Sequence, residues 1–165
     1  MSKVRLAYAG LIGAALLQGL YFYPKLPDTI ASHYSARGYA NAWATRPVFF
    51  IGYGLVLGLM LALFAGLPPL FGRMPDWMIN LPNKDYWLAP ERRAQTMALF
   101  ASQMRWFGVA TLAELILVFQ LVISANLPGS AGFPVGLAGL AFVAFLAFVF
   151  VWTVRMLLAW RLPKG

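Results

Sequence analysis

Four long apolar stretches constrain the fold of this chain more than any other feature. They cover residues 6–23, 47–70, 106–124 and 133–158, and each is close to the roughly 20 residues that a helix needs to cross a bilayer. The whole chain is 61% hydrophobic and 11% charged, whereas soluble domains are about 25% charged. We therefore predict an all-α membrane protein, a bundle of four transmembrane helices.

The segments between these stretches are too short to form a separate soluble domain. The longest are a polar loop at 24–46 and a connector at 71–105, so we expect one integral membrane domain over residues 1–165. The first stretch follows Lys3 and Arg5 as a secretory signal would, but it ends without a small-x-small cleavage site. We expect it to be retained as a helix.

The basic residues predict how the bundle is oriented. With a cytoplasmic N-terminus, only Lys25, Arg37 and Arg46 lie outside, as the positive-inside rule favours. Both termini are then cytoplasmic, the 24–46 loop is external, and the 71–105 connector lies at the cytoplasmic interface. The net charge of +8 is scattered rather than gathered into a stripe, so nucleic acid is not an expected partner. The basic residues expected inside are Lys3, Arg5, Arg73, Lys84, Arg92, Arg93, Arg105, Arg161 and Lys164.

The 24–46 loop is longer than most connections, which makes it a candidate for function. Asp28 is expected to cap a short helix through Ser32. Gly38 supplies a turn, and Trp43 is placed to anchor the chain at the membrane interface. The sequence thus predicts an ordered external cap, and it leaves open whether the cap is only structural or also binds a ligand.

The segment "LPDTIASHYSARGYANAWATR" resembles the signature of the SdpI-like immunity and signalling membrane proteins. The resemblance covers the segment between the first two predicted helices and implies a bacterial inner-membrane protein. It also implies binding or sensing at the external face, in a role of the immunity or signalling type. The positions that match are Leu26, Pro27, Asp28, Ile30, His33, Gly38 and Trp43, with Tyr34 and Arg46 as conservative replacements.

Two positions depart from that signature. Ala31 stands where the family usually has proline, and Asn41 stands where it usually has aspartate. A role for the aspartate as metal ligand or proton acceptor is not transferred to Asn41, because an amide cannot fill it.

The connector contains "YWLAPERR", which looks like a segment of short members of the same family. Pro90 and Glu91 suit the first turn of a helix, because proline needs no amide partner there and a carboxylate complements the helix dipole. This helix is expected either to lie on the membrane or to continue directly into the third span.

The other polar and aromatic residues of the connector have two interpretations. Arg92 and Arg93 meet anionic lipid headgroups, or they pair with Asp85 and Glu91. The connector either contacts lipid, with aromatic side chains in the interface, or binds a cytoplasmic partner. The aromatic residues concerned include Tyr86 and Trp87.

Glu114 is the one acidic residue within the predicted spans. It follows Trp106 by eight residues, roughly 12 Å into a core about 30 Å thick. A carboxylate at that depth is by default a functional hypothesis, and it is expected to face the bundle interior. Arg155 lies about 18 Å away along the bundle, so we expect no direct ion pair. The remaining alternatives are a proton or substrate relay, or a protonated or hydrogen-bonded structural group whose partners would be Gln18, Thr111 or Gln120.

The residue inventory does not suggest catalysis. A zinc site needs three or four ligands, and Asp28 and His33 supply only two. We expect no enzyme activity, no metal and no cofactor. The favoured hypothesis is external binding or sensing, the alternative is an accessory subunit of a larger membrane complex, and the third is a transporter or proton relay using Glu114. The expected partners are membrane lipids and either another protein or a second copy, with the ligand undefined.

Overall fold

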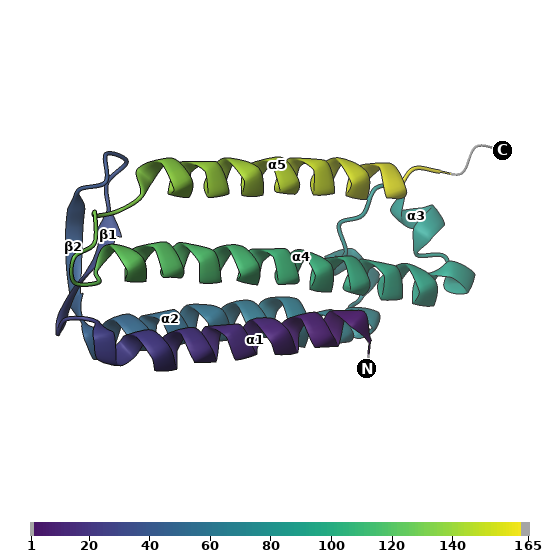
Figure 1. The fold of residues 1–165 in the computed structure, drawn as a ribbon. Coiled ribbons are helices and arrows are strands. Elements are labelled where there is room, and N and C mark those ends of the chain that lie inside the picture. The colour runs from purple at the N-terminus through teal and green to yellow at the C-terminus, as the bar shows by residue number, and fades with distance from the viewer. Residues whose placement is uncertain (1, 163–165) are drawn as a thin grey trace.

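Four long helices lie side by side and a two-stranded hairpin covers one end of them (Figure 1). A computed structural model describes residues 2–162, so Lys164 lies outside the described residues. The helices and strands are α1 (Lys3–Phe22), β1 (Thr29–Tyr34), β2 (Ala40–Thr45), α2 (Arg46–Leu61), α3 (Lys84–Trp87), α4 (Pro90–Ala125) and α5 (Val135–Ala159). Short 3₁₀ or π-helical turns occupy Tyr23–Lys25, Ala62–Gly66, Pro68–Arg73 and Asp76–Met78.

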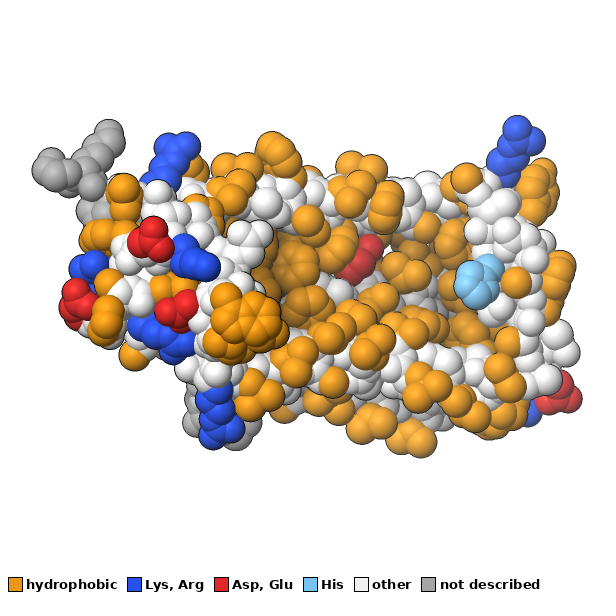
Figure 2. All heavy atoms as spheres, turned by 180° about the vertical axis from the view of Figure 1, so that it is seen from behind, with side chains coloured by type: hydrophobic (Ala, Val, Ile, Leu, Met, Phe, Trp, Pro, Cys, Tyr) orange, Lys and Arg blue, Asp and Glu red, His pale blue; other side chains and the backbone are white. Residues whose placement is uncertain are grey.

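Four helical segments among the described residues are long and apolar enough to cross a membrane. They confirm the prediction of a multi-pass membrane protein with four such helices. Hydrophobic side chains cover the middle of the molecule, and nearly all charged side chains gather at its two ends (Figure 2). We call these the hairpin end and the connector end. The start of α1 and the end of α5 both lie at the connector end (Figure 1). The four segments are Lys3–Lys25, Arg46–Gly66, Pro90–Ala125 and Val135–Ala159.

The second span differs from the helix predicted over 47–70. The regular α-helix ends at Leu61, a π-helical turn follows, and a 3₁₀ turn begins at Pro68. Pro68 and Pro69 lack the amide hydrogen that would continue the helix ladder, and Gly66 just before them weakens it further. The chain therefore leaves the bundle earlier than its hydrophobicity indicates.

The third span begins much earlier than its predicted start at 106. α4 has 36 residues, so it is about 54 Å long, well beyond the roughly 30 Å of a hydrocarbon core. Its first turn contains Pro90 and Glu91, as predicted. The second half of the predicted connector is thus part of α4.

α4 is the central helix and packs closely on its neighbours. Gly108 lies against Phe64 and Tyr8, and a Cβ at this position would overlap with both side chains. The Tyr8 hydroxyl donates a hydrogen bond to the carbonyl of Arg105 at 2.8 Å. Glycine at this position therefore lets α1 and the π-helical turn after α2 approach α4 closely.

α5 stands apart from the other helices along most of its length. None of its residues is buried. Its middle touches α4 through aromatic rings, where Phe107 packs against Phe148 and Trp152. Its two ends are held more firmly, by the hairpin and by the connector.

Candidate functional site

The 26–46 segment forms an antiparallel hairpin. β1 pairs with β2 so that Thr29 faces Thr45 and Ala31 faces Trp43. Gly38 closes the turn with a φ of 83°, which glycine adopts without strain. The expected short helix from Asp28 through Ser32 is wrong, because these residues form a strand whose cross-strand partner follows the turn.

One face of the hairpin is packed on the bundle. Ile30 is fully buried, and Leu26 is buried beside it. They form a hydrophobic cluster with Phe49 from α2 and with Val122 and Ile123 from α4. This cluster fixes the hairpin on the helix ends by burying apolar surface.

Arg46 ties the base of the hairpin together. Its guanidinium donates to the carbonyl oxygens of Tyr23 at 3.1 Å and Leu26 at 2.8 Å. It also pairs with the Asp28 carboxylate at 2.9 Å, although the Asp28 side chain is 94% exposed. Asp28 thus contacts Arg46 and makes no ion pair with His33, which is exposed on β1.

Asn126, the residue after α4, bonds to the edge of β1 that faces away from β2. Its side-chain oxygen accepts from the Ala31 amide at 2.8 Å, and its side-chain nitrogen donates to the Ala31 carbonyl at 3.0 Å. The side-chain amide therefore pairs with β1 much as a neighbouring strand would. Proline at position 31 would lack the amide hydrogen and remove the first of these bonds, so the pairing requires a residue other than proline there.

The tip of the hairpin reaches α5. The Tyr34 ring stacks on Phe133 with centroids 4.4 Å apart, and its hydroxyl accepts from Asn126 at 3.1 Å. Burial raises the pKa of the Tyr34 hydroxyl, and the hydrogen bond from Asn126 opposes that shift. Gly38 lies against Val135 so tightly that a Cβ would come within 2.6 Å of the Val135 side chain. The hairpin therefore crosses the bundle end from α1 to α5.

The opposite face of the hairpin is open. Alternate residues of β2 are exposed, with Trp43 at 62% and Tyr39, just before the strand, at 72%. Asn41 and Thr45 are exposed in the same alternation. We call Tyr39, Asn41, Trp43 and Thr45 the open face. Pro27 is exposed at the hairpin base.

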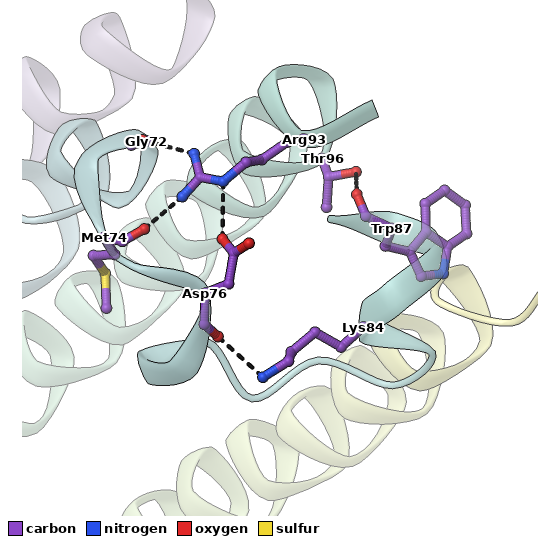
Figure 3. A network of polar contacts seen from close by, with 7 residues as sticks. All are labelled: Gly72, Met74, Asp76, Lys84, Trp87, Arg93 and Thr96. Carbon is purple, nitrogen blue, oxygen red and sulfur yellow. Dashed lines mark hydrogen bonds and ion pairs between the residues drawn. The ribbon is translucent and has the colours of Figure 1, made fainter. Parts of the chain in front are cut away.

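The connector end is organised by Arg93 (Figure 3). Its guanidinium pairs with Asp76 at 2.9 Å and donates to the carbonyl oxygens of Gly72 and Met74. Lys84 donates to the Asp76 carbonyl at 3.1 Å. The interpretation in which Arg93 pairs with Asp85 or Glu91 is wrong, because the chain after α2 folds back over α4 and places Asp76 beside Arg93 instead.

Arg92 has a different environment. It donates to the Tyr86 carbonyl at 2.8 Å, and its guanidinium lies over the Tyr86 ring at 4.0 Å. Asp85 and Glu91 are exposed and form no ion pair within residues 2–162. Both arginines therefore bond groups within the connector, and the interpretation that pairs Arg92 with Asp85 or Glu91 is also wrong.

The connector also holds the end of α5. Trp160 is 2% exposed in a cluster with Leu81, Leu88 and Met97. Its carbonyl accepts hydrogen bonds from Asn83 at 2.8 Å and from the Trp87 indole at 2.9 Å. Trp87, a predicted interfacial aromatic, is thus half-buried against the protein rather than free to meet lipid.

A chain of hydrogen bonds between polar side chains links α1, α2 and α4 inside the bundle. The Tyr53 hydroxyl donates to the Gln18 side chain, which donates in turn to Gln120 at 2.9 Å. Gln120 donates to Ser124 at 3.0 Å. Side-chain hydrogen bonds of this kind join helices within a membrane.

Glu114 is not part of that chain. It is half-buried and makes no hydrogen bond or ion pair with the described residues. Its expected partners Gln18 and Gln120 bond to each other, and Thr111 donates to the Phe107 carbonyl at 3.1 Å. The structure therefore does not show the expected hydrogen bonds to Glu114.

The comparisons with known proteins identify part of this architecture. Residues 10–57 match the family model described as "Domain of unknown function (DUF1648)". No curated protein and no solved structure matches the chain. The matched segment runs from α1 through the hairpin into α2 and covers less than a third of the 165 residues. The family description names no activity.

Sequence reasoning missed two residues that organise the two ends. Asn126 follows a long apolar stretch and precedes "LPG", a pattern that indicates a helix end and not a strand contact. Asp76 lies between proline and tryptophan in an irregular segment, where no periodicity suggests a partner. Both act across long sequence distances, 95 residues to Ala31 and 17 to Arg93.

Proposed function

We propose that this protein is a non-enzymatic bacterial inner-membrane protein that binds or senses a partner through the open face of its hairpin. The single observation that carries the proposal is the contrast between the two faces: Ile30 is fully buried, while Trp43 is 62% exposed. Tryptophan and tyrosine are enriched among the residues that contribute most to binding at protein interfaces. The immunity or signalling role implied by the resemblance is one form of this function.

The orientation proposed with it places the hairpin outside the cell and both termini in the cytoplasm. It rests on the distribution of basic residues, which favours a cytoplasmic connector end. The chain contains no cysteine, so a single introduced cysteine reports its own location. In intact cells, a membrane-impermeant maleimide should label Asn41→Cys and should not label Trp77→Cys, which lies at the connector end. The reverse pattern would refute the orientation.

A photo-cross-linking experiment tests the binding surface. A photoreactive phenylalanine analogue replaces Trp43 in the open face or Trp77 in the connector, two exposed tryptophans at opposite ends. We expect a discrete adduct from position 43 and none from position 77. No adduct from position 43 in native membranes would contradict the proposal.

The second candidate function is an accessory subunit of a larger membrane complex. The exposure of α5 favours it, because none of its residues is buried and an open cleft of about 720 Å³ lies between it and α4. Purification in a gentle detergent should then yield a large partner at fixed stoichiometry. Elution alone or as a homodimer would exclude it.

A transporter or proton relay is the third candidate and depends on Glu114. An unpaired carboxyl within a span supports it. Replacement by glutamine should then abolish transport while leaving abundance unchanged.

A further inference from the structure

The two edges of the hairpin differ in whether their outward-pointing backbone groups have hydrogen-bond partners. Antiparallel pairing leaves alternate residues with their amide and carbonyl groups pointing away from the partner strand. On β1, the amide and carbonyl of Ala31 point away from β2. The Asn126 side chain accepts from the amide at 2.8 Å and donates to the carbonyl at 3.0 Å. The β1 edge is thus closed by the protein itself.

The β2 edge has the same geometry and no such partner. Arg46 donates to the Asp28 carbonyl at 2.8 Å, which makes this pair a hydrogen-bonded one. Hydrogen-bonded and non-hydrogen-bonded pairs alternate along the hairpin, so the pairs Thr29–Thr45 and Ala31–Trp43 are not hydrogen-bonded. On β2, the amide and carbonyl groups of Thr45 and Trp43 therefore point away from β1. The Thr45 carbonyl begins the hydrogen-bond ladder of α2, whose first residue is Arg46. The Thr45 amide and both backbone groups of Trp43 have no other partner among the described residues.

The part of β2 at 43–45 also lacks the usual protection of an exposed edge. Natural proteins place lysine, proline or a bulge on strands that must not pair with other chains. The six residues "ANAWAT" contain no charge and no proline. The register is irregular farther along the hairpin, where successive partners skip Ser32 on β1 and Asn41 on β2, but the pairing is regular from Thr45 to Trp43. β1 lies between β2 and the helix ends, so the open edge of β2 faces away from the bundle (Figure 1).

We infer that the free edge of β2 binds an extended peptide segment, which adds to the hairpin as a third strand. This inference rests on the proposed function and specifies its ligand and mode of binding. Backbone hydrogen bonds to the Thr45 amide and to both backbone groups of Trp43 provide the pairing. The exposed rings of Trp43 and Tyr39 contact alternate side chains of the added strand.

The charges beside β2 favour a peptide with acidic ends. Arg37 is exposed in the turn that precedes β2. Lys25 is exposed in the chain between Tyr23 and Leu26, whose carbonyls Arg46 binds near the other end of β2, and its ammonium lies 3.1 Å from the centroid of the Tyr21 ring. The nearby carboxylate of Asp28 is already paired with Arg46. A second copy of this chain is disfavoured as the occupant, since two copies in one membrane would both point their β2 edges away from the bilayer.

Thr45 provides a matched pair of test variants. Its φ is −67°, which is the angle proline adopts, so Thr45→Pro removes the outward amide without backbone strain. Thr45→Ala removes the same side chain and keeps the amide. Both variants retain the Arg46 and Asn126 contacts that hold the hairpin.

The probe is the fluorescent peptide acetyl-Glu-Val-Thr-Val-Thr-Val-Glu-amide, with a second peptide in which lysine replaces both glutamates. Binding to the full-length protein in nanodiscs is measured by anisotropy. We expect the acidic peptide to bind the wild type and Thr45→Ala equally, and Thr45→Pro roughly fivefold more weakly, as the loss of one hydrogen bond predicts. The lysine peptide should bind more weakly than the acidic one.

The inference is overturned if the acidic peptide does not bind the wild type, or if Thr45→Pro and Thr45→Ala bind it equally. In either case, an adduct from position 43 would leave the proposed function standing with another mode of binding. Absence of both the adduct and peptide binding would remove the proposed function as well.

Discussion

Replacing Asn126 with alanine should open the hairpin without unfolding the bundle. Ala31 is 9% exposed, and the substitution leaves both its amide and its carbonyl without their partner. An unpaired buried backbone group costs about 1–3 kcal/mol, so we expect the hairpin to lose about 2–4 kcal/mol. The Asn126 bond to Tyr34 is lost as well, but this hydroxyl lies nearer to solvent.

Native-state hydrogen exchange measures this loss at single residues. The amides of Ile30 and Ala44 bond across the hairpin, and their protection should fall by about 30- to 1,000-fold, at tenfold per 1.4 kcal/mol. Leu112, buried in the middle of α4, should keep its protection. Ser130→Ala, which removes an exposed hydroxyl in the following turn, is the matched control and should change little. If protection at Ile30 falls less than threefold, Asn126 is not what holds β1.

Three further predictions concern the other contacts. Arg93→Lys should lower the unfolding temperature in detergent more than Arg92→Lys, because a lysine cannot bond Asp76 and two carbonyls together; equal effects would contradict the role of Arg93. Gly108→Val should prevent close packing of α4 and reduce folded yield, whereas Gly139→Val on the open side of α5 should be tolerated, as a reporter fusion would show. Because the pKa of Tyr34 is raised in the fold, its stabilising effect is complete below pH about 10 and is lost as the pH rises through the raised value. Near-ultraviolet circular dichroism should therefore show the hairpin loosening at alkaline pH in the wild type and less so in Tyr34→Phe.

The helical part of the fold could be predicted because hydrophobicity and length determine it. The predicted stretch at 133–158 lies within one residue of α5 at its C-terminal end and within two at its start. The start of α4 at Pro90 also followed from local chemistry, since proline and glutamate favour a first helical turn. Its continuity with the third span was one of two open alternatives.

The candidate site was harder to predict because its contacts are distant in sequence. Asp28 is typical of a helix cap, but its strand is stabilised by a partner strand after the turn and by Asn126. Arg93 had two nearby carboxylates in the sequence, yet the folded connector brings Asp76 to it instead. Local patterns identified which segments matter and not which residues pair.

The link between Asn126 and Ala31 has a consequence for biogenesis. Ala31 is synthesised 95 residues before its partner. At about 5–20 residues per second, β1 waits for about 5–20 seconds after it emerges before the end of α4 exists to close its edge. Membrane insertion of the third helix is therefore the event that completes the cap. A nascent chain stalled before residue 126 would carry two open strand edges, and it is at this stage that a chaperone or a protease would recognise the hairpin.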